Sequence, residues 1–171
     1  MVEHKLATAQ SQWYAVHTRS RHEKLVANGL RGNGIPCFLP LVERRRRWSD
    51  RYMHVQEPLF PGYLFVYMLS DHRIRVLQTR GVVQLVGGEG GHWPIPEDEI
   101  QAIRVALASD LKIDPYPYLR VGREVRVTRG PLKGHTGILV RKQKRHRLVV
   151  SVHLIGRSIA VEIDTANVSA N

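Results

Sequence analysis

The pattern of apolar residues divides the chain into two parts with different expected secondary structure. In the first part, short apolar or alternating runs, typical of β-strands, are separated by segments in which apolar residues recur at helical spacing. We predict strands at residues 13–18, 35–39, 63–69 and 82–86. The third of these runs is almost entirely apolar, which predicts a central strand covered on both faces.

Three helices are expected between and after these strands. Ser20 and Glu23 have the spacing of a capping box at the start of the first helix, and glycines at 32–34 end it. Ser70 is expected to cap a short second helix, and the third begins after Pro96 with acidic residues in its first turn. The residues expected to face inward from these helices are Leu25, Val26, Leu30, Ile74, Leu77, Ile100, Ile103 and Leu107.

A stiff, proline-rich connector at residues 114–119 ends the helical pattern. Beyond it we predict short strands at residues 124–128, 136–141, 148–154 and 158–163. Several short strands in so small a segment indicate a closed barrel, which hides its own edges. We therefore expect a disordered tail at 1–11, an α/β domain at 12–113, and a barrel domain at 120–171.

Charge narrows the choice of partner. The 171 residues include 26 Lys and Arg against 15 Asp and Glu, and 20 of the 26 are Arg. Residues 115–171 have 11 basic and 3 acidic residues, a net charge of +8, whereas residues 1–114 have a net charge of +3. Arginine favours planar, bidentate contacts with phosphate and carboxylate, so a polyanion or a large acidic partner is the expected target.

The candidate chemistry predicts that this protein is not an enzyme. The single cysteine, Cys37, rules out a disulfide framework and lies among apolar residues, which predicts a buried and inert thiol. The nine histidines have no metal-ligand spacing, and the glycine-rich run 87–91 lacks the Lys-Ser/Thr of a phosphate loop and is expected to be a flexible turn. We expect no catalytic residue, no metal and no cofactor. Without a signal peptide or a run long enough to span a bilayer, the expected compartment is the cytoplasm, with no membrane partner.

Two stretches in the first part indicate binding surfaces. In residues 57–63, two prolines fix the backbone while Leu59, Phe60 and Tyr63 compete for one small core. Exposed aromatics on a rigid frame are typical of interfaces, and the alternative is an ordinary strand entrance with its aromatics in the core.

The run Arg44–Arg47, with Trp48 and Arg51, predicts a cationic loop that contacts phosphates, before a strand through Tyr52, His54 and Gln56; the alternative is a solvated hairpin tip. A second basic tip, at residues 141–147, fits RNA or an acidic protein, or serves solubility alone.

Several ordered motifs resemble the NusG family of transcription elongation factors, in which an NGN domain precedes a KOW domain. The likeness extends from Trp13 to Val168. Its landmarks are residues 13–18, 60–63, 81–83, 86–88, 94–96, the KOW signature at 125–134, 150–152, 156–158 and 161–162. The resemblance implies an α+β fold: an NGN α/β sandwich, with an antiparallel-type sheet flanked by helices, followed by a small all-β SH3-like KOW barrel.

The resemblance also implies partners. The NGN domain is expected to dock on the clamp helices of RNA polymerase, to bridge the DNA cleft and to suppress pausing. The residues implied in clamp-helix binding are Trp13, Tyr14, Phe60, Tyr63 and Phe65. His72 and Arg73 lie where the family approaches the opposite pincer of the polymerase, and Arg19, Arg75 and Arg80 where relatives face the non-template DNA strand. This short helix has arginines where sequence-reading relatives have threonines, so phosphate contact, shared with Arg44–Arg47, is the expectation here.

For the KOW barrel, the resemblance implies recruitment of a partner, either the termination factor Rho or a small-subunit ribosomal protein. The motif residues are Val127, Gly130, Pro131, Lys133, Gly134 and Gly137. Residues 48–51, 57–63 and 76–79 look most like the UpxY-type specialised antiterminators. We expect a monomeric elongation and antitermination factor. The alternative is a ribosomal-type RNA-binding KOW protein, which leaves the first domain unexplained.

Overall fold

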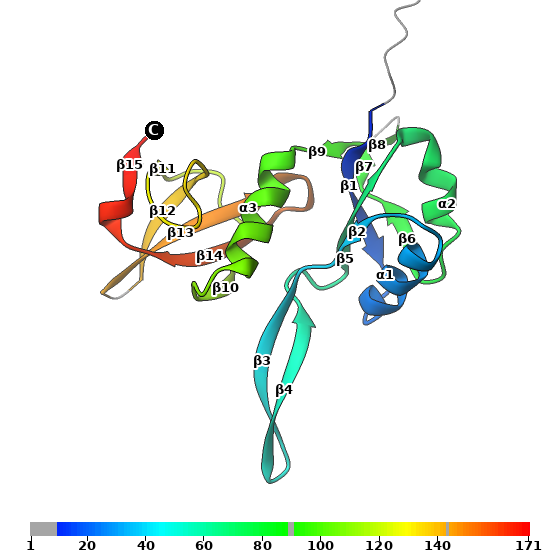
Figure 1. Ribbon diagram of the computed structural model, residues 1–171, viewed down its shortest axis with the longest axis horizontal. Helices are drawn as coiled ribbons and strands as arrows, with labels where there is room; N and C mark the ends of the chain where they lie inside the picture. The colour runs from blue at the N-terminus through cyan, green and yellow to red at the C-terminus, as the bar shows by residue number, and fades with distance from the viewer. Residues whose placement is uncertain (1–9, 89–90, 143) are drawn as a thin grey trace, which may run out of the picture.

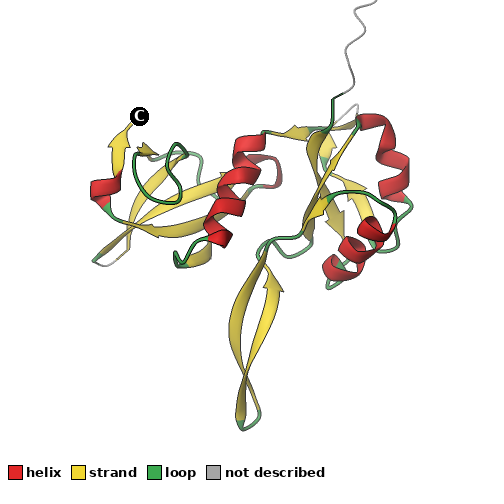
Figure 2. Ribbon diagram, in the orientation of Figure 1, coloured by secondary structure: helices red, strands yellow, loops and turns green. Residues whose placement is uncertain are grey.

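The structure is a computed structural model that describes residues 10–88, 91–142 and 144–171 (Figures 1 and 2). The predicted disordered tail therefore lies outside the described residues, apart from Gln10 and Ser11. In the first part of the chain the elements are β1 (Gln12–Thr18), α1 (Glu23–Gly32), β2 (Cys37–Phe38), β3 (Leu41–Trp48), β4 (Arg51–Pro58), β5 (Tyr63–Met68), η1 (Ser70–His72), α2 (Arg73–Leu77), β6 (Val82–Leu85), β7 (Gly87–Gly88), β8 (Gly91–His92), β9 (Pro94–Ile95) and α3 (Glu97–Ala108). The second part contains β10 (Ile113–Tyr116), β11 (Arg123–Val127), β12 (Thr136–Lys142), β13 (Arg145–Val152), η2 (His153–Ile155), β14 (Arg157–Ile163), η3 (Thr165–Asn167) and β15 (Val168–Ala170).

An antiparallel sheet of order β2-β5-β1-β6, with β9 also paired to β1, forms the N-terminal layer. The predicted central strand is confirmed, because β5 lies between β2 and β1. Helices α1 and α2 cover one face of this sheet and α3 covers the other (Figure 1). Because side chains alternate along a strand, each inner strand supplies two different layers of the core.

The second sheet has the order β10-β14-β13-β12-β11-β15 and forms the predicted small β unit. Helix α3 lies between the two sheets and packs on β13 (Figure 1). One hydrophobic cluster extends from Trp13 and Phe65, through Ile100 and Ile103 of α3, to Val150 in the second sheet. The α+β architecture is confirmed, and its two parts share apolar core.

The linker predicted at residues 114–119 is partly replaced by strand β10. Residues 113–116 pair antiparallel with 158–161 of β14, so the first half of the predicted linker is part of an edge strand. Pro115 is tolerated there because an edge strand needs hydrogen-bond donors on one side only. The Asp114 carboxylate also accepts a hydrogen bond of 2.9 Å from the largely buried Arg147. Tertiary pairing therefore fixes a segment that local rules describe as a spacer.

The β3 and β4 strands form a separate two-stranded sheet that projects from the molecule, and we call residues 41–58 the arm (Figure 1). The prediction of a loop at Arg44–Arg47 was wrong, because these residues lie within β3. Four consecutive arginines have no apolar alternation to reveal a strand. The pairing with β4 supplies the missing partner, from Leu41 opposite Pro58 to Trp48 opposite Arg51.

Several helix details also differ from expectation. The capping box does not form: α1 begins at Glu23 without a side-chain cap, and the Glu23 carboxylate accepts a hydrogen bond of 2.7 Å from Gly62 N instead. No side-chain cap forms at Ser70 either. The predicted inward residues Leu25, Ile74 and Leu77 are exposed, because short helices on one face of a sheet bury only a narrow stripe. The expected glycine-rich turn forms the pair β7–β8, and its tip, residues 89–90, lies outside the described residues.

Candidate interaction surfaces

Four of the five predicted polymerase-binding residues lie together on the side of the N-terminal sheet that faces α3. Trp13, Phe60 and Phe65 belong to one hydrophobic cluster, with Tyr63 packed against it. Phe60 meets Phe65 edge-on, with ring centroids 6.1 Å apart, and Trp13 lies 5.2 Å from Tyr67. We call this ring-rich surface of β1, β5 and the segment before β5 the aromatic face.

Tyr14 is not part of this face. It packs on the α1–α2 side with Val16 and Leu64, and its ring lies 4.8 Å from that of His92. Strand alternation explains the separation, because neighbouring residues of β1 point to opposite sides of the sheet. A motif of adjacent aromatics, Trp13-Tyr14, therefore supplies one residue to each core layer.

The aromatic face is covered, not exposed. The exposed fractions of Trp13, Phe60 and Phe65 are 5%, 2% and 0%, and Leu59 is equally buried. The interpretation of residues 57–63 as exposed interface anchors was therefore wrong for Leu59 and Phe60, and the alternative of core aromatics describes them. Tyr63 is half-buried, and its ring stacks on His17 at 5.2 Å.

Helix α3 and the second sheet provide the cover. The guanidinium of Arg104 lies 4.7 Å from the Trp13 ring centroid and 5.0 Å from that of Phe38. Arg157 of β14 lies 6.0 Å from the Tyr63 ring centroid. Glu99 of α3 accepts a hydrogen bond of 3.1 Å from the His153 amide, and burial raises the pKa of its carboxyl above the ordinary value. Polar contacts thus join α3 and the second sheet around the apolar centre.

The turn before β5 depends on a contact that local sequence patterns do not reveal. Gly62 has φ +84°, a left-handed conformation that favours glycine, and its amide donates to Glu23 Oε1. Leu59 N donates to Pro40 O at 2.8 Å, which holds the two ends of the arm together. Glu23 is thus a buried positioning residue that the capping-box interpretation missed.

The arginines predicted near DNA occupy the α1–α2 side. A hydrogen bond of 2.8 Å from Arg19 N to Gly81 O places Arg19 beside Arg80. Arg75 reaches the end of α1, where its Nη2 donates to Asn33 O at 2.9 Å. His72 and Arg73 lie at the junction of η1 and α2. Arg19, Arg73, Arg75 and Arg80 are exposed, and none of them belongs to the cluster that forms the aromatic face.

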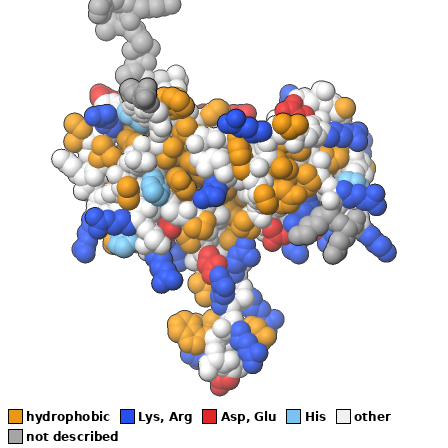
Figure 3. Space-filling model, turned by 180° about the vertical axis from the view of Figure 1, so that it is seen from behind, with side chains coloured by type: hydrophobic (Ala, Val, Ile, Leu, Met, Phe, Trp, Pro, Cys, Tyr) orange, Lys and Arg blue, Asp and Glu red, His pale blue; other side chains and the backbone are white. Residues whose placement is uncertain are grey.

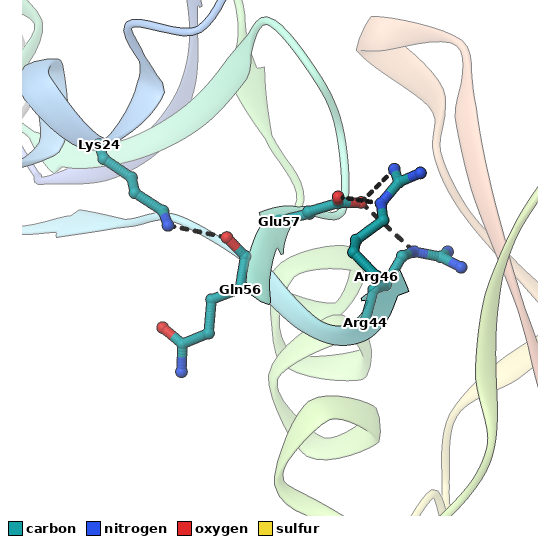
Figure 4. Close-up of polar contacts among 5 residues, drawn as sticks. All are labelled: Lys24, Arg44, Arg46, Gln56 and Glu57. Atoms are coloured by element: carbon teal, nitrogen blue, oxygen red, sulfur yellow. Dashed lines mark hydrogen bonds and ion pairs between the residues drawn. The ribbon is translucent and has the colours of Figure 1, made fainter. Parts of the chain in front are cut away.

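The root of the arm holds a second group of cations (Figure 4). Glu57 Oε1 accepts from Arg46 Nε at 2.7 Å, its Oε2 accepts from Arg46 Nη2 at 3.1 Å, and Arg44 Nε lies 3.8 Å away. The hydrogen bond from Arg46 lowers the pKa of Glu57 below its ordinary value. Lys24 of α1 donates to Gln56 O at 2.7 Å and connects the arm to the helical layer.

The KOW motif residues form the turn between β11 and β12. Gly130 and Gly134 have φ +85° and +90°, and Gly134 N donates to Val127 O at 2.8 Å. Val127 is buried, whereas Pro131 and Lys133 are exposed. A Cβ on Gly137 would come within 2.6 Å of Val149 O, so the neighbouring strand leaves no room for a side chain. The motif therefore fixes backbone geometry and presents Lys133 outward.

Other chemistry is limited within the described ranges. Residues 10–88, 91–142 and 144–171 contain no group of three or more His, Cys, Asp or Glu that could hold a metal ion. None of the helices in these ranges is long and apolar enough to cross a membrane. Cys37 is partly buried, its Sγ lies 3.5 Å from Ala27 O, and burial raises the pKa of its thiol.

Comparisons with known proteins agree with this class, a two-part factor in which an α/β sandwich precedes a small β domain. Residues 11–104 match the family described as "Transcription termination factor nusG". The transcription termination/antitermination protein NusG of Thermus thermophilus is 32% identical over 178 residues, covering 92% of this chain and 97% of that protein. The protein of the same name from Borreliella burgdorferi is 25% identical, covering 89% and 94%.

A solved structure, titled "Domain interaction in Thermotoga maritima NusG", is similar in fold. Its TM-score is 0.57 at 22% identity, covering 94% of this chain and 97% of that chain. The chain belongs to the NusG family, as its motifs predict. Its general role is that of a transcription termination and antitermination factor.

Proposed function

We propose that this protein is a specialised antiterminator that binds the clamp helices of RNA polymerase through residues 12–113. It suppresses pausing and termination by bridging the DNA cleft, and it recruits a second partner through residues 120–171. It acts without catalysis, cofactor or metal, as a cytoplasmic monomer. The observation that carries this proposal is the aromatic face, where Trp13, Phe60, Tyr63 and Phe65 form a single ring-rich layer.

Docking on this face requires movement of its cover. Phe60 and Phe65 are buried, so a partner reaches them only when α3 and the second sheet give way. Tyr63 is the residue of this face that a partner would contact first, because it is only half-buried. Its cover includes the cation–π contact with Arg157 of the second sheet. Such a contact contributes about 0.5–1 kcal/mol at an exposed site, which a large apolar interface exceeds.

The second partner is either the termination factor Rho or a small-subunit ribosomal protein. Exposed Lys133 and Pro131 on the KOW turn support a protein contact at this end of the small sheet. His72 and Arg73 are proposed to face the opposite polymerase pincer. Contact with DNA phosphates, which needs charge and reach but no base-specific geometry, is proposed for Arg19, Arg75, Arg80 and Arg44–Arg47.

The specialised character is proposed from the motifs at residues 48–51, 57–63 and 76–79, of which the first and the last lie near the proposed DNA contacts. Residues 48–51 form the turn of the arm, and residues 76–79 span the end of the short helix α2. Thr79 is buried and donates to Arg75 O at 3.3 Å, so this motif shapes the end of α2. Both places lie beside arginines proposed to meet DNA, where a paralogue restricted to one operon would differ from a general factor.

The test is binding of the full chain to polymerase core in the absence of DNA, with an isolated clamp-helix fragment as competitor. We expect the fragment to compete. Tyr63→Ala should weaken core binding about 30-fold, as expected for an interface residue contributing about 2 kcal/mol. Tyr52→Ala is the matched control, because Tyr52 lies exposed on the arm and should bind as wild type.

Two results would contradict the proposal: core binding that the fragment does not compete, or unchanged binding by Tyr63→Ala. Complete absence of core binding would favour the ribosomal-type RNA-binding function, which the +8 charge of residues 115–171 supports. Tight rRNA binding with a steep salt dependence would then be expected.

A further inference from the structure

We propose that the arm binds in the major groove of double-stranded DNA, with each of its two faces contacting the phosphates of one strand. The inference rests on the proposed function only in taking DNA as the partner of the arm, and it names the form of DNA and the mode of contact. Its basis is the arrangement of arginines, rings and pairing along residues 41–58.

The dimensions of the arm suit a groove. Its two strands have eight residues each and are joined by a two-residue turn at Ser49 and Asp50, where Ser49 has φ +57°. At about 3.4 Å per residue, the ribbon extends roughly 25 Å from its root. The major groove of B-DNA is about 12 Å wide and about 8.5 Å deep, and it admits a two-stranded β-ribbon.

The register distributes positive charge over both faces. Residues directly opposite each other share a face, so Arg44, Arg46 and Arg51 lie with Trp48 on the first face. Arg45 and Arg47 lie with Tyr52 on the second face. Figure 3 shows Lys and Arg side chains gathered over the arm, with apolar side chains at its sides. A ribbon with arginines on both faces matches two walls of phosphate.

Most of these arginines are held in place and still have free donors. Arg46 forms the paired hydrogen bonds with Glu57, Arg47 Nε donates to Ser49 O at 3.3 Å, and the Arg45 guanidinium lies 3.9 Å from the Tyr52 ring centroid. Each guanidinium has five N–H donors, so one or two contacts leave others for phosphate. Fixed side chains also lose less conformational entropy on binding.

The rings of the arm favour a duplex over a single strand. Single-strand binding surfaces stack successive bases on free aromatic faces. Here Arg45 already covers the Tyr52 ring. Trp48 is 68% exposed but lies at the turn, so it cannot form a row of stacking platforms. A single strand running along one face would also leave the arginines of the other face without a partner.

The root sets the direction of the arm in advance. Lys24 donates to Gln56 O (Figure 4). Leu59 N donates to Pro40 O, so both strands are held at the root of the arm. Pro40 and Leu59 are buried at this point. An isolated two-stranded ribbon is only marginally stable in water, and these attachments supply the support that it lacks.

The experiment measures binding of the full chain to a short labelled duplex between about 50 and 200 mM salt. One variant removes two positive charges from the first face (Arg44→Gln with Arg51→Gln) and leaves Arg46 paired with Glu57. Another removes both arginines of the second face (Arg45→Gln with Arg47→Gln). Each should lower the slope of log K against log salt by about 1.8, since each phosphate contact contributes about 0.9. The matched control, Lys112→Gln with Arg123→Gln, removes the same charge from exposed positions outside the arm and should keep the wild-type slope.

Competition identifies the groove. Methyl green, a major-groove ligand, should displace the protein, and netropsin, a minor-groove ligand, should not. The single strand of the same sequence should bind at least tenfold more weakly than the duplex. Circular dichroism of each variant checks that the fold is retained.

The proposal is overturned if only one face affects the slope, if netropsin competes, or if the single strand binds as tightly as the duplex. Loss of binding to DNA-free polymerase core in the arm variants would also overturn it, because the arm would then be a protein contact. Wild-type core binding is measured separately, so failure of the clamp-helix proposal and failure of the groove proposal give different results.

Discussion

The aromatic face and the arm differ in almost every physical property, although both are proposed binding surfaces. The aromatic face is apolar, contributes to the shared core and is covered by α3 and the second sheet. The arm lies largely outside that core, and Trp48, Tyr52 and Met53 on it are exposed. The aromatic face stabilises the fold by burying its rings, whereas the arm contributes little to stability and its rings are exposed to solvent.

The two surfaces would contribute to the free energy of binding in different ways. A covered apolar face supplies a large hydrophobic contribution but must first lose its internal contacts, so affinity is reduced by the cost of opening. An exposed cationic ribbon needs no opening, and its contribution is electrostatic and sensitive to salt. Substitutions on the aromatic face should therefore change stability, and substitutions on the arm should change binding alone.

The largest expected effect is on the free energy of unfolding, when one aromatic residue from each region is replaced by alanine. Phe65→Ala should lower the free energy of unfolding by about 3–5 kcal/mol, because it removes a fully buried ring. Trp48→Ala should change it by less than about 0.5 kcal/mol, because that ring is exposed at the turn. Urea denaturation of both variants measures the contrast, and similar losses in the two would show that the arm belongs to the cooperative core.

A smaller, pH-dependent effect is expected at the cover of the aromatic face. Burial raises the pKa of Glu99 in the folded protein, opposed in part by the His153 amide, while neighbouring Asp98 raises it further. The folded state therefore disfavours the charged carboxylate, which destabilises the protein above the raised pKa and no longer does so below the unfolded pKa. Glu99→Gln should be more stable than wild type at pH 7, and this difference should shrink as the pH falls toward about 4.

Thermal unfolding of the two proteins at matched pH measures that difference, and subtraction removes the titration of all other groups. Glu97→Gln is the matched control, since Glu97 is exposed in the same turn of α3 and does not contribute to the shifted pKa of Glu99. If the stability difference between Glu99→Gln and wild type stays constant with pH, the pKa of Glu99 is not raised by folding.

Much of the fold follows from local pattern, because strands and helices with clear apolar periodicity need no information from elsewhere. The apolar run 63–69 predicts the central strand β5, and the spacing of Ile100 and Ile103 predicts the buried side of α3. The glycines of the KOW motif predict the turn that they form. The family was likewise visible in ordered motifs and is confirmed.

The remainder depends on contacts between distant residues. The Glu23 carboxylate accepts from Gly62 N and does not form its expected cap, because the partly buried amide of Gly62 needs an acceptor. Residues 113–116 become a strand only because β14 offers a free edge, and Phe60 is buried by layers that no local pattern places. The arginine-rich strand of the arm has no apolar signal at all, so its pairing with β4 was the least predictable feature.

The smallest expected effect concerns Glu57 at the root of the arm. The hydrogen bond from Arg46 lowers its pKa, so the contact contributes order to the arm above the ordinary pKa of a glutamate, and this is lost as the pH falls through the lowered pKa. Glu57→Gln should leave the melting temperature unchanged, because the pair lies outside the core. It should increase amide hydrogen exchange in β3 at pH 6 and match wild type once the pH falls below the lowered pKa of Glu57. Asp50→Asn, which removes a charge at the turn, is the control and should exchange as wild type. Equal protection of β3 in wild type and Glu57→Gln at pH 6 would show that Lys24 and the Leu59–Pro40 hydrogen bond hold the arm without help from this ion pair.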